Sequence, residues 1–325
     1  MREISYSQAL AEGLHEEMVR DPSIFLAGED VGVYGGDFGV TKGLQKEFGK
    51  KRCFDTPITE SLLAGLAVGA AAMGLRPVIE FMFNDFMTCA MDQIVNQAAK
   101  MRFMFGGVVK LPLVYRTHFG AGFNAAAQHS QSLESWFVHT PGLYVVAPST
   151  AYDVKGLIKS SIRDDNPVVF LEHIFLYDKK GEVPEAEYIV PIGKAQIRRQ
   201  GKDITIIGYA NMANLAVQAA EKLITQGIDA EVLDLRTLKP FDEPSILSSV
   251  RKTGRVLVLQ EAPRLCGVAA EISAFITENA FKQLKGPIMR LTGYDAPMPF
   301  SPPLEKFYLP DVDKIVEYSK KVMAY

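Results

Sequence analysis

The chain has 325 residues, which suffices for two domains of ordinary size, and 48% of its residues are hydrophobic, enough for two packed cores. Its 35 Lys and Arg residues stand against 38 Asp and Glu residues, so the net charge is -3 and there is no basic surplus. A nucleic-acid partner is therefore disfavoured, and a soluble globular protein is expected.

The start of the chain and its cysteines bear on its compartment. Residues 1–8 carry charged and polar side chains where a signal peptide has an apolar core, which favours a cytoplasmic protein. Uncharged stretches such as 61–75 are shorter than the ~18 residues that a bilayer span needs, so no membrane span is expected. Cys53, Cys89 and Cys266 form neither a CxxC pair nor a metal spacing, and we expect three buried free thiols.

Helix-like and strand-like segments alternate from Ser5 to about Glu172, the pattern of a parallel sheet covered by helices on both faces. Ser5 or Ser7 is the candidate N-cap of the first helix. In chain order, the sequence predicts helix 4–20, strand 23–27, a glycine-rich loop 28–39, helix 59–74, strand 77–81, helix 86–105, strand 113–116, strand 144–147, helix 150–163 and strand 168–171.

A polar stretch at 177–188 has the composition of a linker, and it divides the chain into expected domains 1–180 and 190–325. Four prolines within 296–303 predict an extended segment before the last helix. The second half alternates again, with strands at 204–207, 230–233, 256–259 and 288–291 and helices at 213–225, 243–250, 268–281 and 312–323. The predicted fold class is therefore α/β, with two parallel-sheet domains.

The motif DTPITE at 55–60 places Glu60 in the first turn of a helix rich in glycine and alanine. Gly65 and Gly69, four residues apart, allow another group to approach the backbone closely. A carboxyl group removed from water holds its proton more tightly, so Glu60 could share a proton with a ligand nitrogen. Taken alone, the motif favours a simpler interpretation, in which Glu60 stabilises the helix N-terminus and the glycines permit helix packing.

Two further segments have side chains suited to a ligand site. The sequence EFMFNDF at 80–86 ends a strand and begins a helix, which is where ligands bind in an open α/β sheet. Its Met82 and Phe86 could hold a flat heterocycle, although an ordinary core is an equal alternative. The small-residue loop GAGFNAAAQHSQ at 120–131 carries His129, which can exchange protons near physiological pH or be a structural histidine.

Eight ordered motifs together resemble one family, the β subunits of the pyruvate, branched-chain 2-oxo acid and acetoin dehydrogenase complexes. They are GEDVGVYGGDFGVTKGL (28–44), DTPITE (55–60), GLAVGAAAMGLRPVIEFMF (65–83), DQIVNQAAK (92–100), AAAQHSQ (125–131), HTPGL (139–143), IRDDNPVVFLE (162–172) and EVLDLRTLKPFDE (231–243). The resemblance extends from near the start of the chain to near Pro310. It implies the thiamine-diphosphate-binding fold, with a pyrimidine-binding domain followed by a transketolase C-terminal-like domain.

The resemblance also implies roles for four residues. Glu60 matches the glutamate that hydrogen-bonds the pyrimidine nitrogen of thiamine diphosphate and promotes the imino tautomer, which takes the proton from the thiazolium carbon. Phe86 matches the aromatic residue that packs on the pyrimidine, with Met82 beside it. His129 matches the histidine that assists the substrate and acyl transfer to a lipoyl group. The expected catalytic residues are thus Glu60 and His129, and the expected cofactor-binding residues are Glu60, Met82 and Phe86.

Two metal sites follow from the resemblance. Some family members bind a structural potassium ion, and the matching positions here are Leu113, Ser161, Ile162, Asp164 and Asn166. The family also holds the diphosphate through Mg²⁺ bound by a GDG segment and an asparagine, yet GDG occurs nowhere in this chain. The resemblance therefore implies a separate α subunit that supplies the Mg²⁺ and diphosphate site, in a heterotetramer with the cofactor at the subunit interface.

Within the family, the resemblance is greatest to acetoin dehydrogenase β subunits. The segments that carry it are 96–107, 120–131, 171–173 and 181–185. The expected reaction is cleavage of acetoin to acetaldehyde, or decarboxylation of pyruvate, with transfer of the acetyl unit to lipoamide on a lipoyl-bearing acyltransferase core. A branched-chain 2-oxo acid subunit and a mainly structural assembly subunit are alternatives. A self-sufficient transketolase-like enzyme is disfavoured by the missing GDG and by the length of the chain.

Overall fold

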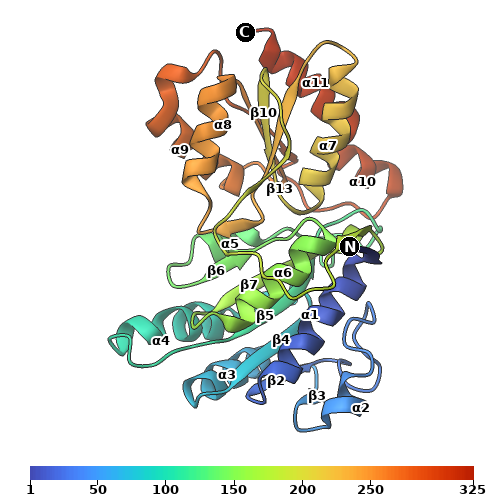
Figure 1. Cartoon of the computed structure of the whole chain (residues 1–325), viewed down its shortest axis with the longest axis vertical. Coiled ribbons are helices and arrows are strands. Elements are labelled where there is room, and N and C mark those ends of the chain that lie inside the picture. The colour runs from blue at the N-terminus through green and yellow to red at the C-terminus, as the bar shows by residue number, and fades with distance from the viewer. The chain divides into compact units, whose positions relative to one another are not determined.

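The computed structural model describes residues 1–325, which form two compact units. The first unit comprises Met1–Phe119 and Trp136–Ile192, and the second comprises Gly120–Ser135 and Gly193–Tyr325. In each unit a sheet is flanked by helices (Figure 1). None of the helices is long and apolar enough to cross a membrane.

Six strands of the first unit lie in the order β6-β7-β5-β4-β2-β3, and every neighbouring pair is parallel. The carboxyl ends of these strands therefore meet at one edge of the sheet, where a ligand site is expected. The elements of this unit are β1 (Arg2–Ser5), α1 (Tyr6–Arg20), β2 (Ile24–Gly28), α2 (Leu44–Phe48), β3 (Cys53–Asp55), α3 (Glu60–Ala72), β4 (Arg76–Phe83), η1 (Phe86–Ala90), η2 (Gln93–Ala98), α4 (Ala99–Met104), β5 (Val114–Phe119), α5 (Glu134–Val138), which starts in the second unit, β6 (Tyr144–Val146), α6 (Ala151–Arg163), β7 (Val168–His173), η3 (Ile174–Leu176) and β8 (Lys180–Val183).

The first helix begins two residues later than the predicted 4–20, because Arg2–Ser5 form strand β1. Ser5 caps the helix with a capping box: its Oγ accepts from the amide of Gln8 at 3.1 Å, and its amide donates to Gln8 Oε1 at 3.0 Å. Strand β1 pairs antiparallel with β8, which lies inside the stretch predicted to be a linker. That stretch is polar because β8 belongs to a short two-stranded ribbon and not to the main sheet.

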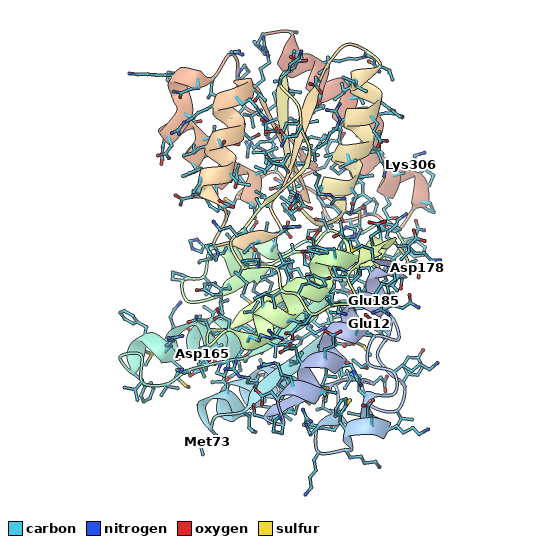
Figure 2. All side chains as sticks on the ribbon, viewed as in Figure 1. Glu12, Met73, Asp165, Asp178, Glu185 and Lys306 are labelled. Carbon is cyan, nitrogen blue, oxygen red and sulfur yellow. The ribbon has the colours of Figure 1, made fainter.

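Helices α1 and α6 pack together through buried lysines. The Nζ of Lys155 lies 3.0 Å from Glu12 Oε2 and 2.6 Å from Glu16 Oε1, and the Nζ of Lys159 lies 2.7 Å from Glu16 Oε2. Both lysine side chains are 1% exposed, and Glu12 lies on α1 where it meets α6 (Figure 2). A buried lysine is tolerated only when it is paired, so these contacts hold the two helices in register.

The predicted helix 86–105 is wrong in detail, because the segment is a 3₁₀ turn (η1), a π-helical turn (η2) and a short α-helix (α4). The hydroxyl of Thr88 donates to the carbonyl of Asp85 at 2.7 Å and so competes with regular helical bonding. Hydrophobic spacing does not reveal a turn widened by one residue, which is why the sequence predicts a continuous helix. π-helical turns are frequent at functional sites.

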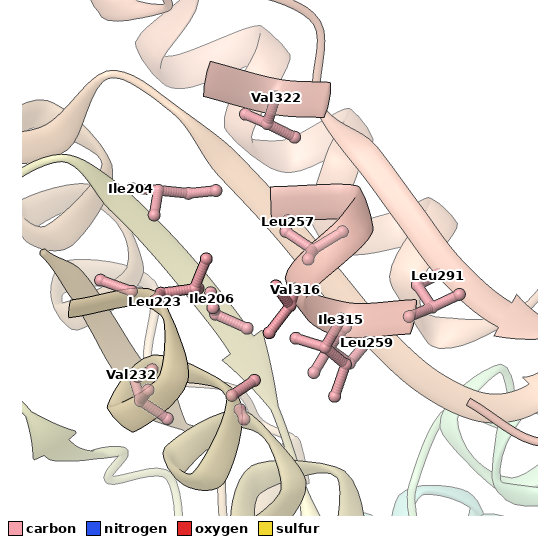
Figure 3. Packing of buried hydrophobic residues seen from close by; sticks show 14 of the residues in the cluster. Ile204, Ile206, Leu223, Val232, Leu257, Leu259, Leu291, Ile315, Val316 and Val322 are labelled. Carbon is pink, nitrogen blue, oxygen red and sulfur yellow. The ribbon is translucent and has the colours of Figure 1, made fainter. Parts of the chain in front are cut away.

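The second unit has a five-stranded sheet in the order β14-β13-β10-β11-β9, parallel except for the edge strand β9. Its core packs residues such as Ile206, Leu257 and Ile315 between this sheet and helices α7 and α11 (Figure 3). Helix α11 has the predicted bounds, and α10 starts at Pro302, inside the stretch predicted to be extended, because proline suits the first turn of a helix. The elements are β9 (Gln196–Arg199), β10 (Ile204–Gly208), α7 (Ala210–Ile224), β11 (Ala230–Asp234), β12 (Thr237–Lys239), α8 (Glu243–Thr253), β13 (Val256–Pro263), α9 (Val268–Ala280), η4 (Phe281–Gln283), β14 (Met289–Gly293), α10 (Pro302–Tyr308) and α11 (Val312–Met323).

The three cysteines are unpaired, but only one of them is buried. Cys53 lies in strand β3, and burial raises the pKa of its thiol to about 12, so the thiol is unreactive at neutral pH. Cys89 and Cys266 are exposed, so the expectation of three buried thiols is wrong for these two. Cys89 lies in the 3₁₀ turn η1 and Cys266 in a connection with positive φ, and neither position faces a core.

Candidate active site

Glu60 is the first residue of α3 and is half-buried at the carboxyl edge of the first unit's sheet. Strands β2 and β3 end side by side, with Gly28 opposite Asp55. Glu29 follows one strand and Glu60 closely follows the other; burial and then the charge of Glu60 raise the pKa of the Glu29 carboxyl. Glu29 was not predicted from the sequence, although its position directly after the buried strand β2 was a usable signal.

The two glycines of α3 differ in their surroundings. A Cβ added at Gly65 would lie 3.4 Å from Gln93 Oε1, so this glycine lies close to the π-helical turn. A Cβ added at Gly69 would meet no atom within 4 Å, and Gly69 is exposed. A Cβ would therefore fit at either position, so helix packing within the chain accounts for neither glycine.

Met82 and Phe86 flank the turn between β4 and η1. Phe86 and Phe83 are half-buried, and their rings meet edge to face with centroids 6.1 Å apart. Met82 is half-buried where the pairing of β4 with β5 shifts register between Phe81 and Phe83, an irregularity that re-aims side chains at strand ends. The structure therefore gathers the predicted aromatic and thioether side chains at the carboxyl edge that also carries Glu60.

A buried ionic network lies beneath this edge, and the sequence analysis did not find it. The guanidinium of Arg116 donates to both oxygens of Glu172 at 2.7 and 2.9 Å and to Glu80 Oε2 at 2.6 Å. Arg116 and Glu172 are fully buried, and Glu80 is 3% exposed. Burial raises the pKa of Glu80, and Arg116 opposes that rise. The available signal was a charged residue inside each of three neighbouring, largely apolar strands, β4, β5 and β7.

His118, at the end of β5, belongs to the same network. The hydroxyl of Tyr177 donates to Glu172 Oε2 at 2.6 Å, so its oxygen accepts from the Nδ1–H of His118. Burial, and then the charge of Arg116, lower the pKa of His118 to about 3. The imidazole is therefore neutral at physiological pH, with its tautomer set by Tyr177.

The glycine-rich loop 28–39 lies against this network. The ring of Phe38 stacks on Tyr177 at 4.3 Å and meets His118 edge-on at 4.7 Å. Gly36 has a φ of +76°, and a Cβ there would lie 2.9 Å from Glu80 Oε1. Glycine is thus required at this position by both conformation and space, and the network holds the loop in place.

His129 lies in the second unit, whereas Glu60, Met82 and Phe86 lie in the first. The loop that carries His129 runs from Gly120 to Ser135 and clusters with residues 193–325, although it follows β5 in the chain. The side chain of His129 is half-buried. The predicted catalytic pair is thus divided between the two units.

The positions predicted to bind potassium offer oxygen atoms, but several of these are already engaged. The Nη1 of Arg76 donates to the carbonyl of Ile162 at 2.8 Å and to that of Asp164 at 3.1 Å. The Oδ1 of Asp164 accepts from the amide of Asn166 at 2.8 Å, and the hydroxyl of Ser161 donates to the carbonyl of Leu157 at 2.7 Å. A carbonyl oxygen accepts two bonds, so the donor type fits potassium, but the neighbouring guanidinium charge weakens cation binding.

The carbonyl of Leu113, the fifth of these positions, accepts from the amide of Val168 at 3.0 Å. The structure has no group of three or more His, Cys, Asp or Glu side chains that could hold a metal ion.

The chain is a two-domain α/β protein, and its first unit has a parallel sheet with an acidic residue at the carboxyl edge and an aromatic pair beside it. Two family models match the chain: "Transketolase, pyrimidine binding domain" over residues 2–179 and "Transketolase, C-terminal domain" over residues 193–315. A solved structure described as "Split gene transketolase, inactive beta4 tetramer" has the same fold, with a TM-score of 0.81 at 22% identity over 99% of both chains. The expected transketolase-like fold is confirmed.

Curated relatives are similar over almost the whole chain. The acetoin:2,6-dichlorophenolindophenol oxidoreductase β subunits of Cupriavidus necator and Bacillus subtilis are 48% and 46% identical, each comparison covering 99% of this chain and 98% of the relative. The pyruvate dehydrogenase E1 component β subunit of Rickettsia felis is 46% identical over 99% of both. The chain therefore belongs to the transketolase-like family of acetoin and pyruvate dehydrogenase β subunits. The expectation of an oxidoreductase subunit is confirmed at the level of this family.

Proposed function

We propose that this chain is the β subunit of a thiamine-diphosphate-dependent dehydrogenase component and that its first unit holds the pyrimidine half of the cofactor. The observation that carries the proposal is the position of Glu60, half-buried at the start of α3 on the sheet edge that also carries Phe86. Thr56, in the same motif, has a buried hydroxyl with no partner in the chain, which suits an edge that receives a polar heterocycle. Family membership makes the cofactor the expected one.

In this proposal each site residue has a separate task. Glu60 holds a proton at the pyrimidine nitrogen, while Phe86 and Met82 pack against the ring and exclude water. When bound, thiamine diphosphate supplies the carbon nucleophile and the electron sink, which no protein side chain provides. His129 moves a proton at the substrate and assists acyl transfer to a lipoyl group.

The proposed substrate is acetoin, with pyruvate as the second candidate. Acetoin cleavage requires removal of a hydroxyl proton as acetaldehyde leaves, whereas pyruvate loses CO₂, so acetoin makes the greater use of a base such as His129. Relatives named for each substrate have nearly the same identity, 48% and 46%, so overall similarity does not separate the two. A branched-chain 2-oxo acid is a third candidate on sequence likeness, and a purely structural assembly role is a fourth.

The proposed assembly is a heterotetramer with an α subunit that holds Mg²⁺ and the diphosphate, bound to a lipoyl-bearing acyltransferase core in the cytoplasm. It is supported by the absence of a GDG motif from this chain and by the β-subunit names of its relatives. We also propose that residues 1–180 form the pyrimidine-binding domain and that residues 190–325 form the transketolase C-terminal-like domain. The loop that carries His129 lies within the first of these ranges but clusters with the second unit.

The test is reduction of 2,6-dichlorophenolindophenol by the purified chain, by its α partner and by their mixture, with thiamine diphosphate and Mg²⁺. We expect activity only in the mixture, with a kcat/KM at least about 10-fold higher on acetoin than on pyruvate, since discrimination by a few contacts is of this order. A mixture inactive on acetoin and on every 2-oxo acid would refute the proposal. Preference for pyruvate would overturn the substrate assignment alone.

We further propose a potassium ion at Leu113, Ser161, Ile162, Asp164 and Asn166. It is supported by the oxygen donors there and opposed by Arg76, so we expect weak binding. Replacing KCl by choline chloride in the same assay should lower the rate by no more than a few-fold. An unchanged rate and an unchanged unfolding temperature would overturn the proposed potassium site.

A further inference from the structure

We propose that Glu305 is a positioning residue, whose carboxylate sets the conformation of the loop that carries His129. The inference rests on the proposed function of His129. It concerns a residue on helix α10, in the proline-rich segment near the end of the chain, that none of the sequence motifs includes.

The carboxylate of Glu305 binds backbone amides at the start of the loop. Its Oε1 accepts from the amide of Gly122 at 2.8 Å and from that of Asn124 at 3.2 Å, and its Oε2 accepts from Asn124 at 3.1 Å. Glu305 is 3% exposed and forms no ion pair. Its buried charge is therefore balanced mainly by backbone amides, so the contact is charge-assisted and short-ranged.

The backbone of the loop is shaped for this anion. Positive φ angles recur at Gly120 (+96°), Gly122 (+114°), Asn124 (+61°) and Ala126 (+61°). Alternation of this kind turns successive amides to one side and makes an anion-binding concavity, which the carboxylate of Glu305 fills. Asn124 and Ala126 are not glycines, so their conformation persists only because surrounding contacts impose it.

A second carboxylate strengthens the anchor. The Oε1 of Glu261, at the end of β13, accepts from the amide of Ala121 at 2.6 Å, and Glu261 is 5% exposed. Ala121 packs in a small buried cluster with Met298 and Tyr308. Three of the first five residues of the loop are thus bound to two carboxylates of the same unit.

The rest of the loop lies beside open space. A cavity of about 340 Å³ borders it, lined by Ala127 and residues 130–133 on the loop side and by Glu261, Pro297 and Tyr308 on the other. The hydroxyls of Ser130 and Ser132 line this cavity without partners in the chain. The cavity leaves space beside the segment around His129, so the polar anchors at the start of the loop contribute to its position.

The test combines exchange and kinetics on Glu305→Ala, Glu305→Gln and a control, Glu278→Ala, which removes an exposed glutamate of α9. In the full chain, hydrogen exchange of amides 121–131 should quicken at least 10-fold for Glu305→Ala and stay unchanged for the control. In the reconstituted enzyme, kcat should fall on the order of 100-fold for Glu305→Ala, the loss expected for a misplaced catalytic group. Glu305→Gln keeps one acceptor oxygen and should lose less on both measures; it also serves if Glu305→Ala does not fold.

A double variant distinguishes positioning from general support of the fold. If Glu305 acts through His129, adding Glu305→Ala to His129→Ala should lower kcat by less than about 2-fold further. The inference would be overturned if the kcat losses of the two single variants multiplied in the double variant, or if hydrogen exchange in the loop were unchanged by Glu305→Ala. Full activity of His129→Ala would instead overturn the proposed role of His129, and the exchange measurement would then still decide whether Glu305 orders the loop.

Discussion

The Glu60→Gln variant is expected to lose turnover by about 10³-fold in the reconstituted enzyme, because a side-chain amide cannot hold and return the proton at the pyrimidine nitrogen. The fold should remain, since Glu60 is half-buried and accepts no bond from its own helix as a cap. The loss of one charge from the first turn of α3 should cost about 0.3–1 kcal/mol of stability. Steady-state dye reduction and urea unfolding measure the two effects separately.

The matched control is Glu243→Gln, which removes an exposed first-turn glutamate of α8. It should show a similar small change in stability and full activity. If Glu60→Gln keeps more than a tenth of the wild-type kcat, the carboxyl does not have the proposed proton role. Its function would then be the one suggested by the motif alone, stabilisation of the helix N-terminus.

Arg116→Met is expected to destabilise the first unit by about 3–5 kcal/mol, because it leaves the buried carboxylates of Glu80 and Glu172 without their cationic partner. The effect should depend on pH. Burial raises the pKa of Glu80, and without Arg116 it rises further. A carboxyl with a raised folded-state pKa favours folding at low pH, and that contribution is lost as pH rises through the folded value, so the destabilisation should be larger at pH 8 than at pH 5.

Urea unfolding at both pH values measures this, with Arg251→Met as control. Arg251 is exposed in the last turn of α8, and its replacement should change stability by less than about 1 kcal/mol at either pH. A destabilisation of Arg116→Met that is small, or that is greater at pH 5, would show that the network is not an ionic one in solution.

The sequence predicted the candidate site residues that depend on local order along the chain. Met82 and Phe86 were predicted from the end of a buried strand and Glu60 from the first turn of a small-residue helix, and parallel strands bring their ends to one edge whatever the details of packing. The same reasoning did not reach Arg116, Glu80 and Glu172, because residues 36 and 56 positions apart become partners only through strand register.

Other differences arise from features that the hydrophobic pattern does not mark. The π-helical turn at Gln93–Ala98 keeps a helical hydrophobic pattern, so nothing in the pattern marks it. The loop Gly120–Ser135 is rich in small residues and clusters with the second unit through carboxylates 140 and 183 positions away, which no spacing rule indicates. Glu305 was overlooked for the same reason.

The central claim is that this chain holds only the pyrimidine half of the cofactor site. The most direct test is equilibrium dialysis of labelled thiamine diphosphate with Mg²⁺ against the isolated chain, the isolated α partner and their mixture. We expect saturable tight binding by the mixture, at one cofactor per αβ pair, and none by the isolated chain at the same concentration. Binding by the isolated chain as tight as that of the mixture would contradict it.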